Sequence, residues 1–300
     1  MRKTARNPSG LPERGYSKQE MKQIALYGKG SIGKSTVATH VSYALANQGR
    51  RVFLMGCDPM GDSTYHLLHE YTKPILDVLT EHDFEYEDIE VAEIVHKSPL
   101  PFENGGSVYC AEAGGPEPGV GCGGKGVIEA INTLKRLEVF DELQPDIVIY
   151  DILGDVVCGG FSQPIRDGFA EETYLVTSGE LEALYQAVNV MGAVNRFAKR
   201  AGAKLGGLIV NLRGLEREEQ IINDFAAKTD TRVLAVLPFS QLVKECGSEA
   251  KTVFEDHPDS VEAEKYSRLA ELVMASDYEP TTPHPMSFEE LYEWWCPYVN

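Results

Sequence analysis

The sequence has no long apolar run and few basic residues. No stretch approaches the roughly 18 apolar residues that a helix needs to cross a bilayer, and the first 20 residues lack the apolar segment of a signal peptide. Lys and Arg number 28 against 46 Asp and Glu, for a formal net charge of −18. Such a charge disfavours nucleic acid and anionic membranes as partners. We therefore expect a cytoplasmic protein that binds neither nucleic acid nor membrane.

The cysteines are few, and none of the six lies in a C-x-x-C pair, which disfavours a zinc ribbon. Cys122 and Cys158 each lie in a glycine-rich stretch after a predicted strand. Two thiolates are too few for a four-ligand iron–sulfur cluster, but a symmetric homodimer would bring four together on its axis. The alternative is that both are ordinary buried thiols. Cys57 and Cys110, at predicted strand ends, are expected in the core.

Apolar runs rich in β-formers alternate with helical patterns along most of the chain, which is typical of parallel strands joined by crossover helices. We predict an α/β fold with a doubly wound, mainly parallel sheet. The predicted strands are residues 23–27, 51–56, 107–110, 146–151, 172–177, 206–211 and 232–237. The predicted helices are residues 34–48, 125–138, 180–200, 216–228, 261–275 and 287–295.

One domain is the simplest interpretation, because the chain contains no internal repeat and no Ser/Gly linker. We assign it to residues 22–276. Residues 1–21 are predicted to be a loosely ordered extension, and residues 277–300 a tail with one short helix. Trp294 and Trp295 in that tail suggest packing against the body of the protein or against a partner.

A phosphate-binding loop is the strongest motif. Residues 28–35, GKGSIGKS, fit the pattern G-x-x-x-x-G-K-[ST] and lie between a predicted strand and a predicted helix. The glycines let backbone N–H groups converge on phosphates, Lys34 adds a point charge, and the Ser35 hydroxyl is suited to Mg²⁺. The loop predicts ATP binding in the P-loop NTPase fold. Lys29 is one lysine more than phosphate binding requires.

Carboxylates follow two of the predicted strands. Asp151 ends the hydrophobic run DIVIYD, where an acidic residue supports Mg²⁺ in such enzymes, although it could instead cap a surface turn. Asp155 follows Leu153-Gly154 and is placed to sense a γ-phosphate. Asp58 and Asp62 follow the second strand, where they would orient water or contact Mg²⁺ through its waters; alternatively they only cap the next helix.

Several long motifs closely resemble the nitrogenase iron protein family. They are GKGSIGKST, GCDPMGDST, GGPEPGVGC (114–122) and DILGDVVCGGF (151–161), supported by TSGELEALY and LGGLIVN, and the resemblance spans about residues 22–295. The family's members are ATP-driven reductases that dimerise around one bridging 4Fe–4S cluster. The resemblance implies a homodimer with ATP, Mg²⁺ and one such cluster. It also implies a ferredoxin or flavodoxin as electron donor and a nitrogenase-like heteromeric complex as acceptor.

The resemblance also implies roles for single residues. Lys29 would reach across the dimer to the nucleotide of the other subunit and couple closure to chemistry. The other implied roles are cluster ligation by Cys122 and Cys158; nucleotide binding by Gly28, Lys29, Gly30, Ser31, Ile32, Gly33, Lys34, Ser35, Thr36 and Asn211; Mg²⁺ binding by Ser35 and Asp151; and hydrolysis and switching by Asp58, Asp62, Asp151 and Asp155.

Three positions depart from the family pattern. Ser31 replaces a glycine, Met60 replaces a lysine, and Lys125 replaces an arginine beside the cluster cysteine. Lys125 and Arg166 are the predicted docking residues. The departures favour a nitrogenase-like relative, such as a methylthio-alkane reductase component, over a nitrogenase or tetrapyrrole-reductase iron protein proper. A second hypothesis, from another class, is a cluster-free positioning or partitioning ATPase.

Overall fold

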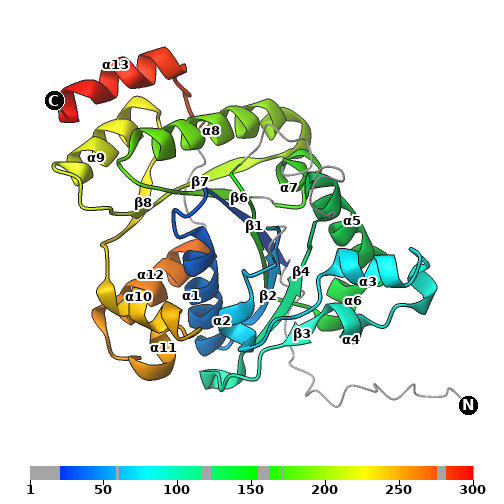
Figure 1. Cartoon of the computed structure of the whole chain (residues 1–300). Coiled ribbons are helices and arrows are strands. Elements are labelled where there is room, and N and C mark those ends of the chain that lie inside the picture. The colour runs from blue at the N-terminus through cyan, green and yellow to red at the C-terminus, as the bar shows by residue number, and fades with distance from the viewer. Residues whose placement is uncertain are drawn as a thin grey trace, which may run out of the picture.

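The computed structural model describes residues 21–58, 61–115, 123–154, 162–170, 172–275 and 282–299. Eight strands form one sheet in the order β3-β4-β2-β5-β1-β6-β7-β8, and every neighbouring pair is parallel except β3 and β4 (Figure 1). The strands are β1 (Lys22–Tyr27), β2 (Arg51–Gly56), β3 (His96–Lys97), β4 (Ser107–Glu112), β5 (Ile147–Asp151), β6 (Glu172–Thr177), β7 (Lys204–Asn211) and β8 (Val233–Leu237). The predicted mainly parallel sheet is confirmed.

The α-helices are α1 (Lys34–Asn47), α2 (Tyr65–Leu68), α3 (Ile75–Glu81), α4 (Val91–Ile94), α5 (Gly123–Arg136), α6 (Val139–Leu143), α7 (Gln163–Arg166), α8 (Leu181–Ala201), α9 (Glu218–Lys228), α10 (Gln241–Ser248), α11 (Val253–Asp256), α12 (Val261–Ala275) and α13 (Phe288–Val299). Short 3₁₀ turns cover Tyr86–Asp88 and Glu103–Gly105. All the predicted strands and helices are present, and their ends agree within two residues except at the C-terminus.

The predicted end of α13 at residue 295 is wrong. The helix continues through Pro297 to Val299. The Arg217 guanidinium donates hydrogen bonds to the carbonyl oxygens of Pro297 and Tyr298, so acceptors that the helix leaves open at its end are satisfied. The sequence does not predict β3 or the short helices α2, α3, α4, α6, α7, α10 and α11. Most of these helices are too short to show a helical period.

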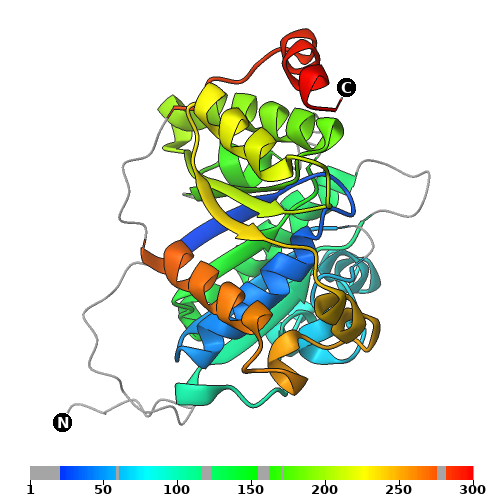
Figure 2. The same ribbon diagram turned by 90° about the vertical axis from the view of Figure 1, so that its left-hand side faces the viewer.

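The core has two layers because alternate residues of each central strand face opposite sides of the sheet. In β1, Ile24 and Leu26 belong to a cluster with α1 and α12, whereas Ala25 and Tyr27 belong to a cluster with α3, α5, α8 and α9. Figures 1 and 2 show these helices covering the two faces. Cys57 and Cys110 are fully buried, as expected for core residues.

The candidate site lies at the carboxyl edge of the sheet, beside β1. The chain winds from β1 toward β2 and β4 in one direction and later toward β6, β7 and β8 in the other. Ligands of doubly wound folds bind at the carboxyl ends of the strands, where the winding direction reverses. Because the strands are parallel, the segments that follow β1, β2, β5, β6 and β7 all begin at this edge.

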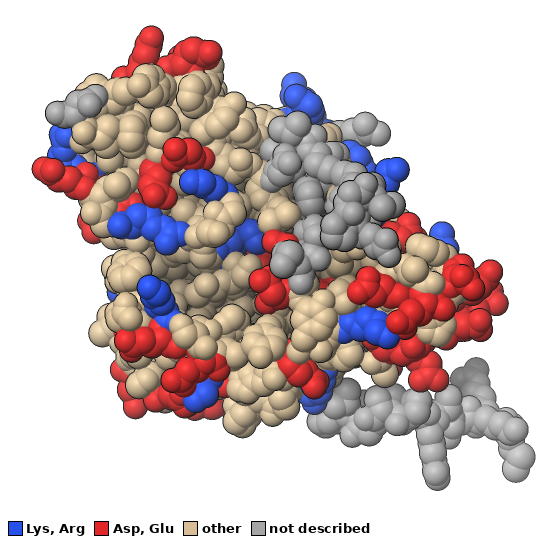
Figure 3. Space-filling model, viewed as in Figure 1, with Lys and Arg blue, Asp and Glu red and all other residues tan. Residues whose placement is uncertain are grey.

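Figure 3 shows acidic side chains gathered over α3 and α4 on one face of the molecule. The excess of negative charge is therefore displayed on the surface rather than confined to the site. Among the described residues, no helix has both the length and the apolar character required to cross a membrane.

Two glycines make a matched test of the packing. A Cβ on Gly192, inside α8, would meet no atom within 4 Å, whereas a Cβ on Gly106 would lie 1.9 Å from the carbonyl oxygen of Ala46. Gly192→Ala should raise the free energy of unfolding by about 0.5–1 kcal/mol, because glycine weakens a helix interior. Gly106→Ala should lower it by about 1–3 kcal/mol through overpacking. Chemical denaturation followed by circular dichroism would measure both; equal effects would contradict the prediction.

Candidate functional site

The phosphate-binding loop connects β1 to α1, as predicted. Gly33 is the N-cap of α1 with φ 95°, a left-handed conformation that glycine adopts without strain. No side chain caps this helix end. The first N–H groups of α1 are therefore available to an anionic ligand, and the helix dipole favours negative charge there. Ser35 and Thr36 lie half-buried in the first turn of α1.

Ser31, the departure from glycine, also has a left-handed backbone, with φ 63°. The turn therefore keeps the conformation that glycine prefers, and the serine is strained in it. Two side chains at the end of β7 hold this part of the loop. The Arg213 guanidinium donates to the carbonyl oxygen of Ser31 (2.6 Å), and the Asn211 amide donates to that of Ile32 (2.8 Å).

Lys34 and Asp151 form a buried ion pair at the centre of the site. Lys34 is 6% exposed and Asp151 is fully buried at the end of β5, so the surface-turn alternative does not hold, and the predicted role of Asp151 at Mg²⁺ stays a prediction. Oδ2 of Asp151 has no hydrogen-bond partner among the described residues. An unsatisfied carboxylate oxygen beside the hydroxyl-bearing first turn of α1 suits Mg²⁺, which prefers oxygen ligands. These residues therefore fit the ion.

The segment after β5 touches the phosphate loop. A Cβ on Gly154 would lie 2.5 Å from the carbonyl oxygen of Gly28, so only glycine permits this approach. The Gln186 side chain, on α8, donates a hydrogen bond to the carbonyl oxygen of Gly154. A change in the phosphate loop would therefore be felt directly by residues 152–154.

Glu112, at the end of β4, is a buried carboxyl that the sequence analysis missed. It is 1% exposed, and its Oε1 accepts a hydrogen bond from the backbone N–H of Thr64 (2.7 Å). A Cβ on Gly56 would lie 1.8 Å from its Oε2. Burial raises the pKa of Glu112 to about 8, aided by the nearby Asp151 and Asp62 carboxylates and opposed by hydrogen bonds from Thr64. The overlooked signal was an acidic residue ending a hydrophobic strand, as in Asp151.

A cavity of about 440 Å³ extends from the phosphate loop. The loop and the first turn of α1 form one end, and the segment after β8 and helix α10 form the other. Figure 3 shows the hollow between the parts of the molecule that hold α9 and α10. His40 stacks on Tyr266 in its wall, with ring centroids 4.3 Å apart, and burial lowers the pKa of His40 to about 4. Phe239, at 62% exposure, also lines the cavity.

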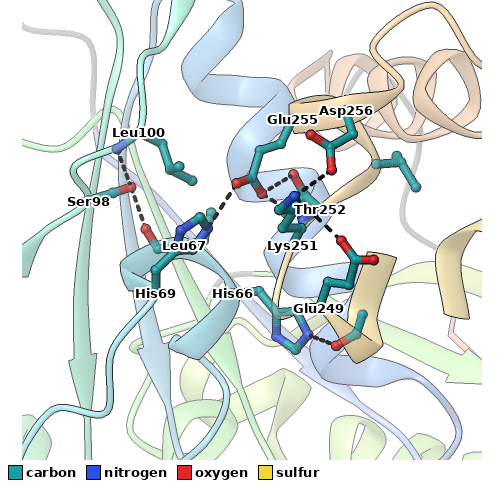
Figure 4. Close-up of polar contacts among 12 residues, drawn as sticks. His66, Leu67, His69, Ser98, Leu100, Glu249, Lys251, Thr252, Glu255 and Asp256 are labelled. Carbon is teal, nitrogen blue, oxygen red and sulfur yellow. Dashed lines mark hydrogen bonds and ion pairs between the residues drawn. The ribbon is translucent and has the colours of Figure 1, made fainter. Parts of the chain in front are cut away.

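A polar network ties α2 to the far wall of this cavity (Figure 4). His66 Nε2 lies 3.2 Å from the carbonyl oxygen of Gly247, and His69 Nε2 lies 2.9 Å from a carboxylate oxygen of Glu255. The backbone N–H of Val253 donates to His40 Nε2 on α1 (3.2 Å). Helices α1, α2 and α11 are thus linked around the cavity.

The remaining predicted residues are dispersed. The Lys29 ammonium lies 3.9 Å from a Glu182 carboxylate, and both side chains are largely exposed, at 42% and 72%. Asp58 is half-buried and Asp62 is exposed, both ahead of α2. Lys125 is exposed in the first turn of α5. Their predicted roles stay predictions.

Arg166, on α7, pairs with Asp167 (2.8 Å), and this hydrogen bond raises the pKa of Arg166. Cys122, Cys158, Asp155 and Met60 lie outside the described residues. The predicted cluster ligands therefore stay predictions.

Glu112 makes stability depend on pH. Its folded pKa, about 8, lies above the ordinary 4.5, so its contribution to stability is full below pH 4.5 and is lost as pH rises toward 8. Glu112→Gln keeps an oxygen for Thr64 but cannot ionise. Relative to the unmodified protein, the variant should become more stable as pH rises from 5 to 8.5, by at most about 1.4 kcal/mol per pH unit. Thermal unfolding of both proteins across this range tests it; parallel curves would contradict it.

Solved structures share the fold. MinD from Pyrococcus horikoshii, complexed with Mg-ADP, aligns with a TM-score of 0.63 and 25% identity over 85% of this chain and 98% of its own. Cobyrinic acid a,c-diamide synthase from Mycobacterium smegmatis, with bound ADP and magnesium, aligns with a TM-score of 0.58 and 18% identity over 87% of this chain and 99% of its own. The predicted P-loop NTPase fold is confirmed.

Relatives found by sequence are more similar to this chain than these solved structures are. Nitrogenase iron protein 2 of Methanothermococcus thermolithotrophicus is 43% identical over 275 residues, which cover 90% of this chain and 94% of the relative. The nitrogenase iron protein of Methanospirillum hungatei is 45% identical over 274 residues, with the same coverage. Residues 22–298 match the family described as 4Fe-4S iron sulfur cluster binding proteins, NifH/frxC family. The chain therefore belongs to the NifH/frxC family of 4Fe-4S iron–sulfur cluster binding proteins.

Proposed function

We propose that this protein is an ATP-hydrolysing, homodimeric iron–sulfur reductase that delivers single electrons to a nitrogenase-like catalytic partner complex. The observation that carries the proposal is the position of Asp151. It is buried against Lys34 of the phosphate loop, and it stands seven residues before Cys158 in the chain. One short segment therefore joins the nucleotide site to a predicted cluster ligand. The similarity to nitrogenase iron proteins supports the same function.

The nucleotide would act by exchanging the partners of the ion pair. Lys34 would bind the phosphates of a triphosphate in the loop and Asp151 would hold Mg²⁺, so each side chain would exchange its present partner for a ligand. Because Gly154 packs on Gly28, residues 151–154 are expected to move with this exchange. Such a shift reaches the residues that lead to Asp155 and Cys158.

The chemistry of three of the other four cysteines supports Cys122 and Cys158 as the cluster ligands. Burial raises the pKa of the thiols of Cys57, Cys110 and Cys246, so these three keep their protons and are poor iron ligands. The described residues hold no group of three or more His, Cys, Asp or Glu side chains suited to a metal ion. A 4Fe–4S cluster, when bound, supplies one-electron chemistry.

Lys29 is suited to act in the other subunit. Among the described residues its ammonium pairs with the exposed Glu182, whereas Lys34 lies at the phosphate site of its own chain. A weak, exposed pair costs little to break. When two subunits close into a homodimer, the Lys29 ammonium would leave Glu182 and contact the phosphates bound by the other subunit.

The docking face would carry Lys125 and Arg166, two positive charges on a strongly acidic chain, and meet a complementary acidic patch on the catalytic complex. A ferredoxin or flavodoxin would supply the electrons. Among possible acceptors we favour a methylthio-alkane reductase, because Ser31, Met60 and Lys125 depart from the pattern of nitrogenase proteins.

Iron content tests the cluster. Anaerobically purified protein should hold about two irons per chain, because a four-iron cluster is shared by two chains. Cys122→Ala should lose the iron and the visible absorbance, whereas Cys246→Ala, which removes a buried thiol elsewhere, should keep both. Full iron content in Cys122→Ala would show that the proposed ligand is wrong.

Lys29→Ala tests the action across the dimer. The variant should bind MgATP with nearly unchanged affinity, because Lys34 and the loop N–H groups remain, yet lose ATP-dependent electron transfer to the partner complex. Lys73→Ala, at an exposed pair with Glu81, is the control and should leave both unchanged. Normal electron transfer in Lys29→Ala, or complete loss of ATP binding, would contradict the assignment.

A further inference from the structure

Glu218, in the first turn of α9, is a buried carboxylate that joins two loops at the carboxyl edge of the sheet. It is 4% exposed. Its Oε1 accepts from the backbone N–H of Gly179, after β6, at 2.9 Å. Its Oε2 accepts from the backbone N–H groups of Arg213, Gly214 and Leu215, after β7, at 2.8, 2.9 and 3.1 Å. Four N–H donors on one carboxylate fix the two loops relative to each other.

The segment after β7, whose backbone N–H groups bind Glu218, also contacts the phosphate-binding loop. Arg213 has its backbone N–H on Glu218 and its guanidinium on the carbonyl oxygen of Ser31. Asn211, two residues earlier, holds the carbonyl oxygen of Ile32. Because Ser31 has a strained left-handed backbone, its conformation depends on such outside support.

The other end of this chain of contacts is the C-terminal helix. The indole N–H of Trp295 donates to the carbonyl oxygen of Gly179 (2.8 Å), so both polar groups of Gly179 are engaged, one by α9 and one by α13. Figures 1 and 2 show α13 lying against α8 and α9 on the side away from α1. Trp295 thus extends the hydrogen-bonded network from α13 to Gly179, Glu218, Arg213 and Ser31.

We infer that Trp295 and Glu218 are positioning residues of the nucleotide site, which hold the phosphate-binding loop in its binding conformation through Gly179 and Arg213. Neither side chain lines the cavity, so they act on the ligand only through other residues. The C-terminal helix α13 thereby supports the nucleotide site from outside the cavity, through hydrogen bonds. The inference rests on the proposed function, which makes ATP the ligand.

The neighbouring tryptophan provides a matched control. Trp294 is also half-buried on α13, but its ring packs against Phe225 and Tyr298, with centroids 6.0 and 5.2 Å away. Trp295→Phe removes the N–H and keeps an aromatic ring, and Trp294→Phe makes the same chemical change without that hydrogen bond. A difference between the two variants isolates the bond to Gly179 from the general docking of α13.

The experiment measures binding of MgADP and MgATP to the full-length, anaerobically purified protein by calorimetry. Trp295→Phe should bind both about two- to tenfold more weakly, the range expected for loss of one neutral hydrogen bond. Trp294→Phe should bind them as the unmodified protein does. Hydrogen exchange of the amides in residues 29–36, without nucleotide, should quicken in Trp295→Phe and not in Trp294→Phe.

A double variant tests the order of the network. Glu218→Gln places an amide NH₂ group against N–H donors and should weaken binding by more than Trp295→Phe does. Adding Trp295→Phe to Glu218→Gln should have little further effect, because Trp295 acts through the same loops. If Glu218→Gln fails to fold, the two tryptophan variants decide alone.

The outcomes separate the two proposals. Equal nucleotide affinity in Trp295→Phe and the unmodified protein, or equal losses in both tryptophan variants, would overturn the inference and leave the proposed function intact. Absence of nucleotide binding in the unmodified protein would instead overturn the proposed function.

Discussion

The ion pair of Lys34 and Asp151 is the constraint on which the rest of the site depends. Two opposite charges are removed from water at the end of a fully buried strand, and each is tolerated there only because the other is present. The pair cannot stay intact and also serve both ligands, because phosphate would compete for Lys34 and Mg²⁺ would compete for Asp151. Under the proposed function, such a site would have two alternative sets of contacts, and the nucleotide would select between them.

Glu112 is also a buried carboxyl group, but it is stabilised by staying protonated and not by an ion pair. It ends β4 as Asp151 ends β5, and both strands flank β2. Among the described residues no lysine pairs with Glu112, and burial raises its pKa to about 8, which keeps it protonated at neutral pH. A neutral acid holds the backbone of Thr64 without adding charge beside Asp151. The ends of β4 and β5 thus carry two buried carboxyl groups with only one compensating cation.

The fold and the phosphate loop were predictable because their signals are local. Buried parallel strands appear as continuous apolar runs, and the loop appears as a fixed spacing of glycines before Lys34. Asp151 followed from its place at a strand end. Glu112 carried the same signal but no motif around it. Glu218 and Trp295 were not predictable, because their partners lie at distant positions in the chain and only the packed structure brings them together.

Ser31 departs from the family pattern in its side chain but not in its backbone. The serine replaces a glycine, and its backbone remains left-handed. The conformation is supported by Arg213 and Asn211, which hold the carbonyl oxygens of Ser31 and of the next residue, Ile32. Loss of glycine's freedom at one position is thus offset by contacts from the end of β7.

The supports of the phosphate loop come from several strand ends rather than one. Asp151, at the end of β5, and Arg213, after β7, contact the loop directly, whereas Gly179, after β6, reaches it through Glu218 and Arg213. Because these segments start from one rigid parallel sheet, a change in the loop is resisted at all of them together. The conformation of the loop therefore depends on contacts along the whole carboxyl edge, from residues 151–154 to the segment after β7.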